Sequence, residues 1–181
     1  MTHQKSGRPR AGEFAAYAAE DIAFVPGDDA ILALHSQGER IGREFGALDD
    51  AAVAGVRYAP GKWTVKEILG HLVDDERIFL YRMLTVARGD SLALPGFDEN
   101  LYVSTAGFET RAWAELLKDY RVMRKGTLRF LGGLPTEAWD RQGMVNGYAA
   151  SVRGLAFHVA GHELHHLRVL EERYRPLLPS R

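Results

Sequence analysis

Residues 64–87 carry apolar side chains on two opposite faces of one helix, and this pattern most constrains how the chain folds. Ile68 and Phe79 share one face, whereas Leu69 and Val73 share the opposite one. A helix that is apolar on both sides is buried on both sides. The segment therefore predicts a helix that is either central in a bundle or part of a subunit interface.

Three other segments of similar length also have helical periodicity and are bounded by capping residues, proline or glycine. Thr64 and Glu67 form a capping box at the start of the two-sided helix, and Ser151 precedes the last segment. The four predicted helices cover roughly residues 28–48, 64–87, 109–131 and 151–174. No segment predicts a strand, so the predicted fold class is all-α, a four-helix bundle. The long connection over residues 89–108 allows a crossover between the second and third helices.

The predicted bundle covers residues 28–181, and Pro26-Gly27 separates it from the start of the chain. Residues 1–27 begin with a basic stretch that contains Gly and Pro and continue with the Ala-rich segment AGEFAAYAAEDIAF. We expect this leader to be poorly ordered or to form a short helix.

Composition narrows the chemistry that the chain can perform. It contains no cysteine, so a metal must be held by His, Asp or Glu, and any thiol must arrive with a substrate or cosubstrate. The net charge of −1 gives no reason to expect binding of nucleic acid or of an anionic membrane. No apolar run approaches the roughly 18 residues of a membrane span, and the first residues lack the apolar stretch of a signal peptide. We therefore expect a cytoplasmic protein.

Four of the seven histidines fall within nine residues of the last predicted helix. His162 and His166 are one turn apart and only about 40° apart around the helix axis. They continue an apolar stripe, so their side chains are expected to point into the bundle, where two imidazoles can hold one metal ion. His71 lies on an apolar stripe of the second helix and is the best candidate for a third ligand. Three nitrogen ligands suit Zn, Ni, Fe or Co.

Several other polar residues near these three histidines are candidates for a role at the site. Asp75, one turn after His71, is a candidate for orienting a ligand, and Arg82 on the same face is a candidate for meeting an anionic substrate group. An ion pair between these two residues is the alternative. His158 is a candidate partner of the ligands, whereas His165 is expected to be solvated. Hydrogen-bonded core histidines remain the alternative to a metal site as a whole.

The segment His162-Glu163-Leu164-His165-His166 also matches the H-E-x-x-H pattern of zinc proteases. The wider context does not fit, because the following residues, LRVLEERY, lack the downstream Gly and third His of the extended motif. Glu163 is therefore expected on the helix surface or beside the ligands, rather than as a general base.

A resemblance to the DinB-like superfamily of damage-inducible and related bacterial proteins is carried by three segments: RYAPGKWTVKEILGHLVDDERIFLYRMLTVARGD, LPGFDENLYV and GYAASVRGLAFHVAGHELHHLRVLEERY. The likeness spans about residues 30–175 and leaves the leader outside. It implies a four-helix bundle, often dimeric, with a divalent metal held by three histidines that correspond to His71, His162 and His166. It implies no role for Asp98, which lies in the second segment.

The same resemblance implies a metal-dependent enzyme that acts on a small molecule. Members of the superfamily resemble transferases that use a low-molecular-weight thiol, or metal-dependent hydrolases. The alternative is a non-catalytic, dimeric helical bundle whose histidines or metal only stabilise the fold. An open coordination position in a cleft would favour the enzyme, and a closed shell of four protein ligands would favour the structural site.

Overall fold

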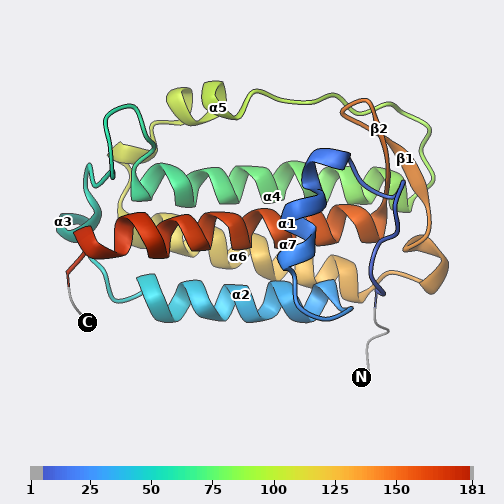
Figure 1. Ribbon diagram of the computed structural model, residues 1–181, viewed down its shortest axis with the longest axis horizontal. Coiled ribbons are helices and arrows are strands. Elements are labelled where there is room, and N and C mark those ends of the chain that lie inside the picture. The colour runs from blue at the N-terminus through green and yellow to red at the C-terminus, as the bar shows by residue number, and fades with distance from the viewer. Residues whose placement is uncertain (1–5, 180–181) are drawn as a thin grey trace.

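Four long helices form the bundle in the computed structural model, which describes residues 6–179 (Figure 1). They are α2 (Ala30–Phe45), α4 (Val65–Ala87), α6 (Trp113–Gly132) and α7 (Val152–Val169). The predicted all-α four-helix bundle is confirmed. Residues 1–5, which include His3, and residues 180–181 lie outside the described part. None of the described helices combines the length and apolar character needed to cross a membrane.

Helix α4 is packed on two sides, as its two apolar faces predict. It contacts both α6 and α7, and α2 contacts the same two helices from the other side of the bundle. Helices α4 and α6 run in the same direction in Figure 1, and residues 88–112 return along the length of the bundle between them. The predicted crossover is therefore confirmed. This connection contains the short helix α5 (Glu99–Ala106).

Polar side chains cap the first turns of the helices, including those predicted from the sequence. The Asp29 carboxylate accepts hydrogen bonds from the backbone N–H groups of Ile31 and Leu32 at the start of α2. Thr64 and Glu67 form the expected capping box of α4, and Ser151 caps α7. Asp98 has a cap role too, because it accepts a hydrogen bond from the Leu101 N–H at the start of α5.

The remaining elements are short and connect or cover the long helices. Two are helices, α1 (Ala19–Phe24) and α3 (Asp50–Val53), and two are strands, β1 (Gln142–Val145) and β2 (Tyr148–Ser151). Tight helical turns lie at Ala16–Ala18, Phe108–Thr110, Thr136–Ala138 and Arg175–Leu177. A wider π-helical turn at Leu170–Tyr174 ends α7.

The β-hairpin contradicts the expectation that the chain forms no strand. β1 and β2 pair antiparallel around Asn146 and Gly147, whose φ angles of 51° and 79° fit a two-residue hairpin turn. Asn-Gly is a strong hairpin signal, but each strand has only four residues and no clear alternation. Leu94 also joins β1, since its N–H donates to the Met144 carbonyl at 2.9 Å.

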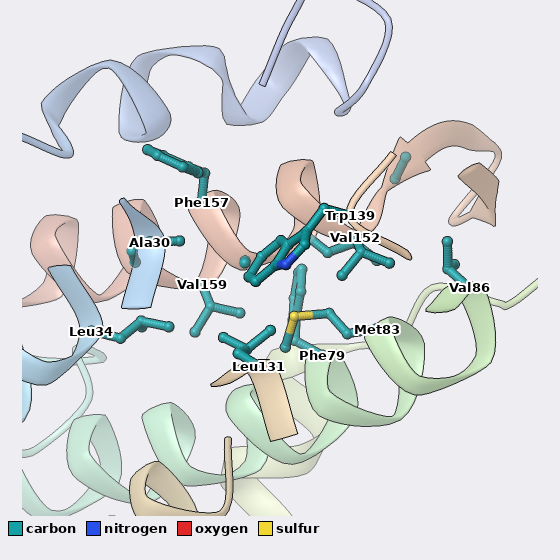
Figure 2. Packing of buried hydrophobic residues seen from close by; sticks show 14 of the residues in the cluster. Ala30, Leu34, Phe79, Met83, Val86, Leu131, Trp139, Val152, Phe157 and Val159 are labelled. Atoms are coloured by element: carbon teal, nitrogen blue, oxygen red, sulfur yellow. The ribbon is translucent and has the colours of Figure 1, made fainter. Parts of the chain in front are cut away.

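The apolar core has two clusters along the bundle. Figure 2 shows the cluster nearer the hairpin, where Phe79, Met83, Leu131, Trp139 and Phe157 pack together from four different parts of the chain. The second cluster contains Trp113 and Tyr120 of α6 and lies nearer the other end. Trp113 and Trp139 are thus core residues.

Part of the leader is helical and packs onto the bundle. Ala18 and Ile22 belong to the first core cluster, and α1 lies against α7. The approach is close because Gly161 of α7 has no side chain, and a Cβ atom there would lie 2.5 Å from the carbonyl group of Asp21. The division of the chain at residue 27 remains a prediction.

A buried ionic cluster lies between the four long helices. Arg124 of α6 donates hydrogen bonds to the carboxylates of Glu76 on α4 and Glu163 on α7, and to the Leu34 carbonyl of α2. Tyr120 donates a further hydrogen bond to Glu163 at 3.0 Å. Glu163 is only 2% exposed, so of its two predicted placements, on the helix surface or beside the ligands, the first is wrong. Burial raises the pKa of Glu163, although the Arg124 charge opposes this shift.

Replacing Gly161 tests the contact between α1 and α7. We expect Gly161→Ala to lower the free energy of unfolding by about 1–3 kcal/mol, because the added methyl group clashes with the backbone of α1. The control is Gly126→Ala in α6, where no atom lies within 4 Å of the added carbon, and we expect it to gain about 0.5–1 kcal/mol. Urea unfolding measures both. A Gly161→Ala variant as stable as the parent would contradict the packing of α1.

Replacing Arg124 tests the ionic cluster. Arg124→Ala leaves two buried carboxylates without their cation, and we expect a loss of about 3–5 kcal/mol in the free energy of unfolding. The exposed neighbour Arg121 provides the control, since Arg121→Ala should change stability by less than about 0.5 kcal/mol. Equal stability of the two variants in urea would show that the cluster contributes little.

Candidate metal centre

Three histidines from two helices meet inside the bundle. His71 comes from α4, and His162 and His166 come from successive turns of α7. The Nε2 atom of His162 lies 3.3 Å from that of His71 and 3.1 Å from that of His166. One ring nitrogen from each residue lies within 4.8 Å of the others, so the three could hold one metal ion.

The two separations from His162, 3.3 and 3.1 Å, fit a coordinated ion better than hydrogen bonds. Ligand nitrogens about 2.0–2.1 Å from one metal are roughly 2.9–3.4 Å apart in octahedral or tetrahedral geometry. As hydrogen bonds, both contacts would have to share Nε2 of His162, which offers a single proton or a single lone pair. A cation satisfies all three nitrogens at once.

Asp75 orients the central histidine. Its Oδ2 atom lies 3.2 Å from Nδ1 of His162, so the proton stays on Nδ1 and the Nε2 lone pair is free for a metal. Burial opposes the charge on both groups, but their attraction outweighs it. It raises the pKa of His162 and lowers that of Asp75. The contact is compatible with the orienting role suggested for Asp75, which stays a prediction.

The other two histidines are neutral at neutral pH. Burial lowers the pKa of His71 to about 4, and the charge of His162 acts in the same direction. Burial also lowers the pKa of His166 well below its usual value. Neutral imidazole is the form that coordinates a metal, so neither ring has to lose a proton first.

Trp63 forms a wall beside two of the rings. Its ring centre lies 4.7 Å from that of His71 and 6.2 Å from that of His166, nearly parallel to the latter. Tyr174 donates a hydrogen bond of 2.6 Å to the Trp63 carbonyl and anchors this segment. Trp63 therefore packs against both histidine rings and restricts their rotation.

A cavity of about 450 Å³ opens onto the histidines. His162, His166 and Asp75 line it, together with parts of the chain that the sequence analysis did not connect with the site. These parts are the leader (Tyr17 and Asp21), the crossover connection (Phe97 and Glu99) and the hairpin turn (Asn146). Nothing in their spacing signals this role, because they lie up to 129 residues apart and meet only in the folded chain.

The structure separates the other candidate residues. Arg82 lines the cavity but donates its hydrogen bond to the Pro95 carbonyl at 2.9 Å. Between described residues, no ion pair joins Arg82 to Asp75, so that alternative is wrong. His158 packs its ring against Phe79 and contributes to the cavity wall. The side chain of His165 is 44% exposed, as expected, with Nδ1 3.4 Å from an Asp21 oxygen.

Residues 33–170 match the sequence pattern of the DinB superfamily. The chain belongs to the DinB superfamily. A similar solved structure is that of YfiT from Bacillus subtilis, described as a probable metal-dependent hydrolase with an unusual four-helix bundle topology. It aligns with 94% of this chain and 93% of its own length at 16% identity, with a TM-score of 0.74. At that identity the likeness shows the fold alone.

No curated protein sequence is similar enough to this DinB-superfamily chain to count as a match. The family and the fold thus come from the comparisons, whereas the chemistry of the site has to be argued from its own geometry.

Metal content tests the three-histidine group. We expect the untagged protein to bind about one equivalent of zinc or nickel by elemental analysis, and His71→Ala and His166→Ala to lose most of it. His165→Ala is the matched control, since this neighbouring histidine lies outside the group and should leave the content unchanged. Asp75→Asn should weaken binding about 10–100-fold. Full metal content in His71→Ala would exclude the site.

Proposed function

We propose that this DinB-superfamily protein is a metal-dependent hydrolase of a small molecule, with a divalent transition metal held by His71, His162 and His166. The observation that carries this proposal is the open side of the group. Three imidazole nitrogens converge, and two of the three histidines, His162 and His166, line a cavity of about 450 Å³, which is within the usual size range of ligand pockets.

The number of protein ligands favours catalysis over a structural role. Structural zinc sites are usually closed by four protein ligands, whereas catalytic sites keep one position free. Among the described residues, the group contains three histidines, and neither Asp75 nor His158 belongs to it. Asp75 instead contacts His162 on the ring nitrogen that faces away from the group.

A bound divalent metal would supply Lewis acidity and make a nucleophile available at neutral pH. The residues of this chain then have separate roles. Asp75 holds the Nδ1 proton of His162 and keeps its ring in one orientation. His71 and His166 stay neutral because they are buried. Trp63 packs beside the His71 ring, and the cavity provides room for a substrate.

The family resemblance also suggests a second reaction, transfer of a thiol. The chain has no cysteine, so the thiol would have to be a second, free molecule in the cavity. Hydrolysis needs only water as the second reactant and is the simpler use of one cavity. A homodimer and a cytoplasmic location also remain proposals, and the mass in solution by light scattering tests the first.

Activity assays on a panel of small esters and amides test the proposal. We expect hydrolysis by the zinc-, nickel-, iron- or cobalt-loaded protein, loss of it with a chelator, and at least a roughly hundredfold fall in kcat/KM in His166→Ala. His165→Ala should retain the activity. Each assay is run with and without a small thiol. Turnover only with the thiol would replace hydrolysis by transfer, and full activity in a metal-free His166→Ala variant would reject both.

A further inference from the structure

We propose that the guanidinium group of Arg82 binds a single carboxylate of the substrate, at a position in the cavity separate from the histidines. This inference rests on the proposed function, because it describes the second anchoring point of the molecule that the metal centre would hydrolyse.

Arg82 is a buried cation that no carboxylate of the described residues contacts directly. Only 4% of the residue is exposed, yet it lines the cavity. Its one hydrogen bond goes to a neutral group, the Pro95 carbonyl, and no carboxylate forms an ion pair with it in the described part of the chain. A buried charge is costly unless an opposite charge or several hydrogen bonds satisfy it. A ligand in the cavity would supply the missing partner.

The free donors of Arg82 face the cavity. A guanidinium group has five N–H donors, and the bond to Pro95 uses one of them. Among described residues, the buried nitrogen and oxygen atoms without a partner belong to Gln37 and Arg153, not to Arg82. The remaining nitrogens of Arg82 are therefore in contact with open space rather than enclosed in protein. The open space beside this residue is the cavity.

Three contacts hold the guanidinium in place before a ligand arrives. Its central carbon lies 4.9 Å from the ring centre of Phe79 and 5.7 Å from that of Phe97. The bond to Pro95 fixes one edge. A guanidinium that is already oriented can present two parallel N–H groups to the two oxygens of a carboxylate and loses little side-chain entropy on binding.

The charge of the cavity favours a carboxylate over a dianion such as a phosphate monoester. Arg82 is the sole cationic arginine or lysine among the described lining residues, whereas Asp21, Asp75 and Glu99 are acidic. The acidic groups would repel a second negative charge. Burial lowers the pKa of Arg82, and Asp75 opposes this shift, but an arginine in this position stays protonated at neutral pH.

The position of Arg82 on α4 indicates an extended substrate. His71 and Arg82 are 11 residues apart, which places them on nearly the same face of the helix with Cα atoms about 16 Å apart. Phe79 lies between them in the sequence of α4, lines the same cavity as Arg82 and contacts its guanidinium group. The carboxylate and the bond to be hydrolysed are therefore separated by an apolar part of the substrate that packs on aromatic side chains.

Calorimetric titration of the zinc-loaded full-length protein tests the inference with three probes: phenylbutyrate, its neutral amide, and the matching phosphonate. We expect the carboxylate to bind at least about tenfold more tightly than the amide. Arg82→Met should abolish this preference, and Arg82→Lys should keep part of it. Arg77→Met is the matched control, because it removes the same charge from the exposed outer side of α4. Circular dichroism shows whether each variant is folded.

The His71→Ala variant separates this inference from the proposed function. If Arg82 binds the carboxylate, the preference over the amide persists in His71→Ala, even where that variant holds no zinc. A preference that disappears there would assign the carboxylate to the metal and overturn the inference. Equal binding of carboxylate and amide, no carboxylate binding at millimolar concentration, or tighter binding of the phosphonate would overturn it too. Absence of zinc from the parent protein would instead reject the proposed function.

If Arg82→Met does not fold, the affinities of the parent protein and of Arg82→Lys for the carboxylate and for the amide still test whether the guanidinium binds the carboxylate. An undiminished preference in Arg82→Lys with an unchanged affinity would show that the planar guanidinium is not the binding group. A lower affinity of Arg82→Lys for the carboxylate, with an unchanged affinity for the amide, would support binding by the guanidinium.

Discussion

A single arginine connects all four long helices. Arg124 extends from α6 and donates hydrogen bonds to Glu76 on α4, to Glu163 on α7 and to the Leu34 carbonyl of α2. Its donors leave a planar group in fixed directions, so these contacts limit the rotation of each helix about its own axis. Most of the surrounding interior is apolar, and a rotated helix would leave a carboxylate buried without a partner.

This rotational constraint also sets the geometry of the metal centre. Asp75 and His162 are the chain neighbours of Glu76 and Glu163, and successive residues point about 100° apart around a helix. When the two glutamates face Arg124, Asp75 and His162 face one another, and their atoms lie 3.2 Å apart. His71 lies one turn before Asp75 and joins them. The buried ionic cluster thus positions the histidines without touching the metal position.

The cavity has a different origin from the ligands. The histidines lie on long helices held in the core, whereas Tyr17, Phe97 and Asn146 come from the leader, the crossover connection and the hairpin turn. Changes in these three segments would alter which molecule the cavity accepts without moving the metal ligands.

The four helices, the caps at Thr64 and Ser151, and the pairing of His162 with His166 were predictable because each depends on residues within a few positions of one another. His71 followed from the two apolar faces of its helix. Local pattern could not show that Glu163 pairs with Arg124, that Arg82 lacks a carboxylate, or that α1 covers α7. Those features depend on which distant segments pack together, and only the tertiary structure decides that packing, because the interactions that stabilise it act between residues far apart in the chain.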